Sequence, residues 1–94
     1  MNIDNIIWLR NVVDKIVRKH NVMPEEAEQI FDSHPQFRFI EKGKTKGENM
    51  YAAMGQTEEG RYLIVYFIRK SPTEALVITA REMERGERGT YGKK

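Results

Sequence analysis

Hydrophobic residues recur at two different spacings along this chain. From about residue 11 to residue 31 they lie three or four positions apart, which is typical of helices with one buried face. From residue 37 to residue 80 they alternate with polar residues or run continuously, which is typical of strands. The order predicts two helices, four antiparallel strands and a last helix over residues 81–91. This is the order of an α+β domain with a curved sheet covered on one face.

The first helix is predicted from Asn11, a good N-cap residue, to Asn21, which tolerates the left-handed conformation found where helices end. Its apolar stripe follows at helical spacing: Val13, Ile16, Val17 and His20. A short apolar segment, residues 3–8, precedes it. That segment is too short for periodicity to separate an edge strand from the beginning of a helix.

The second helix is predicted to begin at Pro24, because proline suits the first helical position and the acidic residues after it complement the helix dipole. Its buried stripe consists of Ala27, Ile30 and Phe31. Pro35 disfavours helical backbone in the residue before it, so the helix should end before residues 33–35.

Four strands are predicted after the second helix, over residues 37–41, 49–54, 61–69 and 75–80. The third is the longest and is apolar on both faces, which favours a central position in the sheet. A basic, glycine-containing loop over residues 42–47 connects the first two strands.

The composition restricts the class of protein without selecting a function. A chain of 94 residues makes one domain, residues 1–94. The absence of cysteine excludes disulfides and thiolate metal sites, and no apolar run approaches the length of a membrane span. With no secretory signal visible, a cytoplasmic location is expected. The net charge of +2 permits nucleic-acid binding but does not require it.

Two arginines mark the strand ends of the predicted sheet. Arg61 begins the longest strand, and Arg81 ends the next one. Because antiparallel strands place the start of one beside the end of the other, we expect the two guanidiniums to lie together. The last helix would bring Glu84, Glu87 and Arg88 to the same end. This combination predicts a place that can hold a phosphate.

The chain resembles the BrnT-type toxin family through residues spread over most of its length. The family pattern has a tryptophan twelve residues before Lys-His-Gly-Val, an acidic pair before alanine, Gly-Arg before an apolar strand, and Ile-[Ser/Thr]-Ala-Arg before glutamate and tyrosine. The residues that fit these slots are Trp8, Lys19, His20, Val22, Glu25, Glu26, Ala27, Phe31, Gly60, Arg61, Ile78, Thr79, Ala80, Arg81, Glu87 and Tyr91.

The resemblance implies a ribonuclease toxin of a type II toxin–antitoxin pair, with a fold similar to that of RelE-like mRNA interferases. It implies RNA as substrate and, as partner, a BrnA-like antitoxin with a ribbon-helix-helix DNA-binding part. It also implies RNA cleavage without a metal or other cofactor. It leaves a homodimer open.

Metal-free cleavage of RNA needs a base for the 2′-hydroxyl proton, an acid for the leaving 5′-oxygen, and cations around the phosphorus. We expect Arg61 and Arg81 to bind the scissile phosphate. His20 and Glu87 are the candidates for proton transfer. The expected RNA-binding residues are basic and lie in three segments: Lys19, Lys42, Lys44, Lys46, Arg85 and Arg88.

Each candidate also has a structural interpretation. Arg81 can pair with Glu84 or Glu87 and hold the last helix to the sheet, while an arginine at a hairpin end, such as Arg61, is often only solvated. His20 lies on the apolar stripe of its helix, which favours packing. The lysine loop is typical of a solvated loop, or it can steer RNA electrostatically.

Two other functions remain open at this point. The first is a toxin fold that is catalytically weak or inactive and acts only in a complex with its antitoxin. The last helix favours this function, because its run of arginines is interrupted by Gly86 and Gly89. The second is a plain RNA-binding domain, which would need Tyr62 and Tyr66 exposed on the sheet to stack bases.

Overall fold

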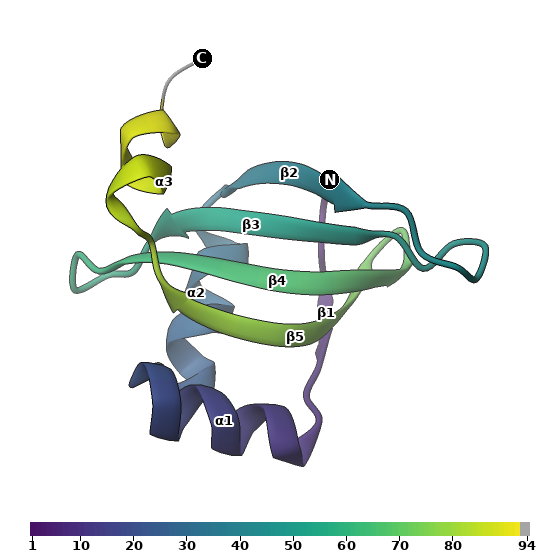
Figure 1. Cartoon of the computed structure of the whole chain (residues 1–94), viewed down its shortest axis with the longest axis horizontal. Coiled ribbons are helices and arrows are strands. Elements are labelled where there is room, and N and C mark those ends of the chain that lie inside the picture. Colours follow the sequence, from purple (N-terminus) through teal and green to yellow (C-terminus); the bar gives the residue numbers. More distant parts are fainter. Residues whose placement is uncertain (93–94) are drawn as a thin grey trace.

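The computed structural model describes residues 1–92. Its elements are, in order, β1 (Asn5–Ile7), α1 (Arg10–His20), α2 (Pro24–Asp32), β2 (Gln36–Glu41), β3 (Met50–Gln56), β4 (Tyr62–Ser71), β5 (Glu74–Glu82) and α3 (Arg85–Thr90). The strands form one sheet in the order β1-β5-β4-β3-β2, with α1 and α2 on one side of it (Figure 1). The α+β class is as predicted, and β4 is the central strand as predicted.

The sheet differs from the prediction in having a fifth strand. The apolar segment before α1 forms β1, which pairs in parallel with β5 from Asn5 opposite Glu74 to Ile7 opposite Leu76. The sheet is therefore mixed, not wholly antiparallel. Backbone N–H groups of Asp4 and Asn5 also donate to the carbonyl of Thr73, at 2.8 and 3.1 Å. A three-residue strand has too little periodicity to be identified without knowledge of this distant partner.

The boundary between β5 and the last helix also differs from the prediction. β5 extends to Glu82, and α3 begins only at Arg85. Arg81 therefore lies in a strand, not in a helix. The helix is shorter than the predicted range because Arg81 and Glu82 continue the pairing of β5 with β4, opposite Ile64 and Leu63. Gly86 and Gly89 lie within α3, where each costs about 1 kcal/mol relative to alanine.

The buried stripe of α1 agrees with the prediction in part: Ile16 is buried as predicted, Val13 and His20 are half-buried, and Val12 is buried although it was not predicted. Val17, in contrast, is 37% exposed. A second stripe at residues 9, 13 and 17 has the same helical spacing, so the sequence alone could not select the side that meets the sheet. The helix also begins after Leu9, so Asn11 is not its N-cap. The predicted end is correct, because Asn21 adopts a left-handed conformation with φ of 54°.

The predictions for α2 are confirmed. It begins at Pro24, and the three residues of its predicted stripe are buried against the sheet. The Glu26 carboxylate accepts a hydrogen bond from the backbone N–H of Met23 at 3.0 Å, which satisfies one of the free donors at the helix start. Residue 26 therefore has its side chain fixed at the start of α2.

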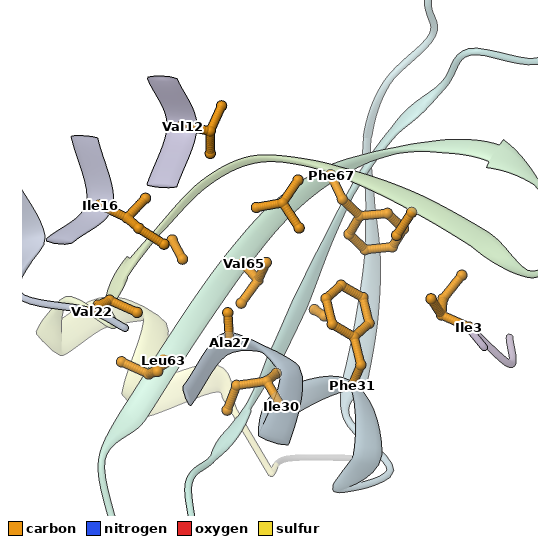
Figure 2. Close-up of a cluster of buried hydrophobic side chains, with 14 residues drawn as sticks. Ile3, Val12, Ile16, Val22, Ala27, Ile30, Phe31, Leu63, Val65 and Phe67 are labelled. Carbon is orange, nitrogen blue, oxygen red and sulfur yellow. The ribbon is translucent and has the colours of Figure 1, made fainter. Parts of the chain in front are cut away.

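The two faces of the sheet have different surroundings. Along β4, alternate residues point to opposite sides. Leu63, Val65 and Phe67 pack with α1 and α2 in the main core, which Figure 2 shows between the helices and the sheet. Ile64 and Tyr66 belong to a smaller cluster on the other side. We call these sides the helix-covered face and the open face.

Among residues 1–92, no helix is long and apolar enough to cross a membrane.

Candidate functional site on the open face of the sheet

Arg81 lies on the open face. It pairs across the sheet with Ile64, which in turn pairs with Met54, and both of these residues are buried in the smaller cluster. The Arg81 guanidinium donates two parallel hydrogen bonds of 2.8 Å to the two carboxylate oxygens of Glu87. Its Nη2 also donates to the hydroxyl of Tyr66 at 3.2 Å. Arg81 thus occupies the middle of a polar cluster on this face.

The Arg81–Glu87 pair holds α3 to the end of the sheet. Glu87 Oε1 also accepts a hydrogen bond of 2.8 Å from the backbone N–H of Glu84, the N-cap residue of α3. Glu87 is half-buried, while the other residues of α3 are exposed. The structural interpretation of Arg81 is therefore confirmed: it pins the helix to β5.

The same pair shifts both pKa values in the direction that keeps the two groups charged. Hydrogen bonding from Arg81 is the main cause that lowers the pKa of Glu87. Burial opposes it, and the Glu84 N–H and the charges of Arg81 and Arg38 add to it. The hydrogen bond to Glu87 likewise raises the pKa of Arg81. A carboxylate whose pKa is lowered is a weaker proton acceptor, so Glu87 is better suited to be a counterion than a general base.

Two more arginines lie on the open face near α3. The Arg88 guanidinium is 4.2 Å from the centre of the Tyr62 ring, a cation–π contact. Tyr91 packs edge-on against the same ring, with centroids 5.9 Å apart, and so anchors the end of the helix. Arg38 of β2 donates to the Thr90 hydroxyl at 3.4 Å. Arg38 and Arg88 add positive charge to this end of the open face, where Arg81 is paired with Glu87.

Sequence reasoning missed Arg38 and did not connect Tyr66 with Arg81. Arg38 pairs with Ala52, which pairs with Tyr66, so the two residues lie in one cross-strand row. The signal was present only in part. Because side chains alternate along a strand, Arg38 and Phe37 are expected on opposite faces of the sheet. Which residues lie beside Arg38 can be known only from the registers of the neighbouring strands.

Arg61 lies on the helix-covered face, which contradicts the prediction that it joins Arg81. It bonds to both carboxylate oxygens of Glu26 at 2.8 Å and to the carbonyl oxygen of Asn21 at 3.0 Å. It also donates to Glu82 at 3.0 and 3.2 Å. Arg81 and Glu82 are consecutive strand residues, so their side chains point to opposite faces. The two guanidiniums therefore share an end of the sheet but not a face.

The other predicted site residues, except Arg85, lie apart from Arg81. Lys19 and His20 end α1 on the helix-covered side, where Lys19 is exposed and His20 is half-buried. The loop between β2 and β3 lies at the far end of the sheet from α3 (Figure 1). It holds three exposed lysines, Lys42, Lys44 and Lys46. Arg85 is exposed at the start of α3. The structure therefore brings together Arg81, Glu87 and Arg88, but not the full predicted set.

The sequence matches a known protein family over most of its length. A family model described as "Ribonuclease toxin, BrnT, of type II toxin-antitoxin system" matches residues 8–87. The chain belongs to the BrnT family. Membership implies an RNA target and an antitoxin partner. No match was found among curated proteins.

Several residues of the BrnT pattern have a structural role in this chain. Trp8, just after β1, donates its indole N–H to the Glu28 carboxylate of α2 at 2.9 Å. Arg61 links β4 to α2 through Glu26. Trp8 and Arg61 thus connect the sheet to the helix layer.

We expect Arg61→Ala to destabilise this BrnT-family protein by about 1–3 kcal/mol. The side chains of Arg61 and Glu26 are only 24% and 13% exposed, so removing the guanidinium leaves a mostly buried carboxylate without its partner. Urea unfolding would measure the loss. Lys70→Ala is the matched control, because the Lys70–Glu48 pair is more exposed. It should cost less than about 1 kcal/mol. Equal costs for the two variants would contradict the expectation.

Stability should fall in acid as the pH drops below the unfolded pKa of glutamate, about 4.3. Burial alone would raise the pKa of Glu26, but hydrogen bonds from the Met23 N–H and from Arg61 lower it overall. Because the folded pKa lies below the unfolded value of about 4.3, the stabilisation is present above that pH and is lost as the folded carboxylate takes up a proton. Urea unfolding at stepped pH would measure it. Glu26→Gln should flatten the slope, and an unchanged slope would refute the assignment.

Proposed function

We propose that this chain is a metal-independent endoribonuclease toxin that binds RNA on the open face of its sheet, with Arg81 holding the scissile phosphate. The proposal keeps Arg81 from the sequence prediction. It replaces Arg61 with Arg38 and Arg88, which lie on the same face as Arg81.

One observation carries the proposal. Arg81 presents its two terminal nitrogens to the two oxygens of Glu87 at equal distances of 2.8 Å. A guanidinium binds a phosphate in the same two-point manner. On this face it is accompanied by the Tyr66 hydroxyl and by further cations. On the helix-covered face, in contrast, two carboxylates already occupy Arg61.

The chemistry follows from RNA itself. The 2′-hydroxyl loses its proton to water and its oxygen attacks the phosphorus. The bond to the 5′-oxygen breaks, that oxygen takes a proton from water, and the products are a 2′,3′-cyclic phosphate and a 5′-hydroxyl. Negative charge grows on the phosphoryl oxygens, where Arg81 and Arg38 would stabilise it. Tyr66 would orient the phosphate through its hydroxyl. Glu87 would act as the counterion that RNA displaces from Arg81.

The remaining predicted residues have smaller roles in this proposal. No chemistry is assigned to His20, because it ends α1 on the other side of the sheet from Arg81. The lysine loop between β2 and β3 would attract the RNA backbone at a distance, and its contribution should weaken as salt increases.

The test is cleavage of a defined RNA by the purified protein in the presence of EDTA. We expect cleavage to persist at the rate without EDTA and to leave 2′,3′-cyclic phosphate and 5′-hydroxyl ends, which end-labelling and mass spectrometry identify. Intact RNA across a range of salt, or loss of activity with EDTA, would refute the proposal.

The Arg81–Glu87 pair also favours a second candidate, a toxin-fold protein that acts only in complex with its antitoxin. In this conformation the Glu87 carboxylate compensates the positive charge of Arg81. This candidate predicts tight binding to a small ribbon-helix-helix partner and no growth arrest when the chain is expressed alone. Growth arrest that Arg81→Ala relieves would exclude it.

A further inference from the structure

A hollow of about 230 Å³ lies at the sheet end where β4 begins and β5 finishes. It is lined by Gly60, Arg61, Tyr62, Glu82, Met83 and Arg88. It is smaller than the pockets of about 300–1,000 Å³ that take drug-sized ligands. Its size suits one flat ring system.

The charges on the Arg61 side of the hollow disfavour a phosphate as its occupant, and the other lining cation, Arg88, lies over the Tyr62 ring. The carboxylates of Glu26 and Glu82 are bonded to Arg61, so this cation is already compensated. The Glu82 carboxylate is itself 64% exposed and would repel an anion at the rim. A neutral group that can hydrogen-bond and stack fits these surroundings better than a charged one.

The Tyr62 ring offers such a group a stacking surface. The flat guanidinium of Arg88 covers one face of the ring through a cation–π contact. Arg88 itself is exposed. Met83 is buried beside it, and Tyr91 supports the ring edge-on. Single-stranded RNA is commonly bound by stacking its bases on tyrosine rings or arginine planes. A base can therefore take the position that Arg88 now occupies.

We propose that this hollow is a nucleobase subsite, in which a base of single-stranded RNA stacks on Tyr62 and displaces the Arg88 guanidinium toward the RNA backbone. The inference rests on the proposed function for the nature of its ligand. Arg88 directly follows Glu87 in the chain, and Glu87 holds Arg81, so the subsite would take a nucleotide close to the scissile phosphate. It would anchor the RNA strand on one side of the cleaved bond.

The test measures binding and does not depend on cleavage. The probes are fluorescein-labelled 2′-O-methyl RNA oligonucleotides, which lack the attacking hydroxyl, in an intact form and in a series with one abasic position each. Fluorescence anisotropy gives Kd for the wild type, Tyr62→Leu and Tyr62→Phe. We expect one abasic position to weaken wild-type binding by about 5- to 100-fold, and Tyr62→Leu to remove most of that difference. Tyr62→Phe keeps the ring and should behave as the wild type does.

A second variant covers the case in which Tyr62→Leu does not fold. Arg88→Ala changes an exposed residue and leaves the ring in place, so it should bind RNA less tightly overall but keep the penalty at the abasic position. Equal abasic penalties in the wild type and Tyr62→Leu would overturn the subsite, as would loss of the penalty in Arg88→Ala. A protein that cleaves RNA but has no abasic penalty refutes the subsite alone, whereas a penalty without cleavage refutes the proposed function alone.

Discussion

Replacing Arg81 by alanine is expected to lower the rate of RNA cleavage by about 100- to 1,000-fold, the loss typical when one preorganised donor to a transition-state oxyanion is removed. The guanidinium donates through two nitrogens to one anion, and alanine supplies neither the hydrogen bonds nor the charge. Single-turnover cleavage of an end-labelled RNA, with protein in excess, would measure the effect without contribution from product release.

Two variants separate this chemical role from the structural one. Arg81→Lys keeps the positive charge but loses the fork, so it should recover only part of the rate. Glu87→Ala releases α3 from the same contact but leaves the guanidinium free for RNA. If Arg81 binds the phosphate, Glu87→Ala should retain cleavage. If the loss in Arg81→Ala comes only from a detached α3, Glu87→Ala should lose as much, and the proposed role of Arg81 would be wrong.

Phe67→Ala is expected to destabilise the fold by about 3–5 kcal/mol, a large part of the stability of a domain of this size. Phe67 is fully buried in the central strand, and its ring contacts the rings of Phe31, Phe37 and Tyr51 at centroid distances of 5.2, 6.0 and 5.9 Å. Removing it leaves a cavity between α2 and the sheet. Urea unfolding followed by circular dichroism would measure the change.

Phe39→Ala is the matched control for this variant. Phe39 contacts the same Tyr51 ring at 5.6 Å but is 54% exposed on the edge strand β2. Because Phe39 lies at the surface, its removal leaves no enclosed cavity and should cost less than about 1 kcal/mol. Similar costs at positions 39 and 67 would mean that burial does not set the stability of this core.

Much of the fold was predictable because local patterns decide it. The Pro24 start, the stripe of α2 and the left-handed Asn21 depend on neighbouring residues only. The central position of β4 follows from apolar residues on both of its faces. The stripe of α1 and the strand β1 were not predictable in this way, since each depends on which distant segment it meets.

The candidate site was only partly predictable, because it depends on the register in which β4 pairs with β5. Arg61 and Arg81 do lie at one end of the sheet, as the antiparallel order required. The structure pairs Arg81 with Ile64, which is three positions from Arg61. An odd separation along a strand places side chains on opposite faces, so a shift of one residue in the assumed pairing decides whether the two arginines meet. The sequence contains no local signal that specifies this pairing.

The parallel pairing of β1 has a consequence for how the protein is made. Asn5 must pair with Glu74, so this edge of the sheet can close only after residue 74 has left the ribosome. The entropy of closing so long a loop opposes early docking of the N-terminal segment. During synthesis, α1, α2 and the first hairpins can form before β5 is available, and the apolar side chains that pack on β5 stay exposed until then.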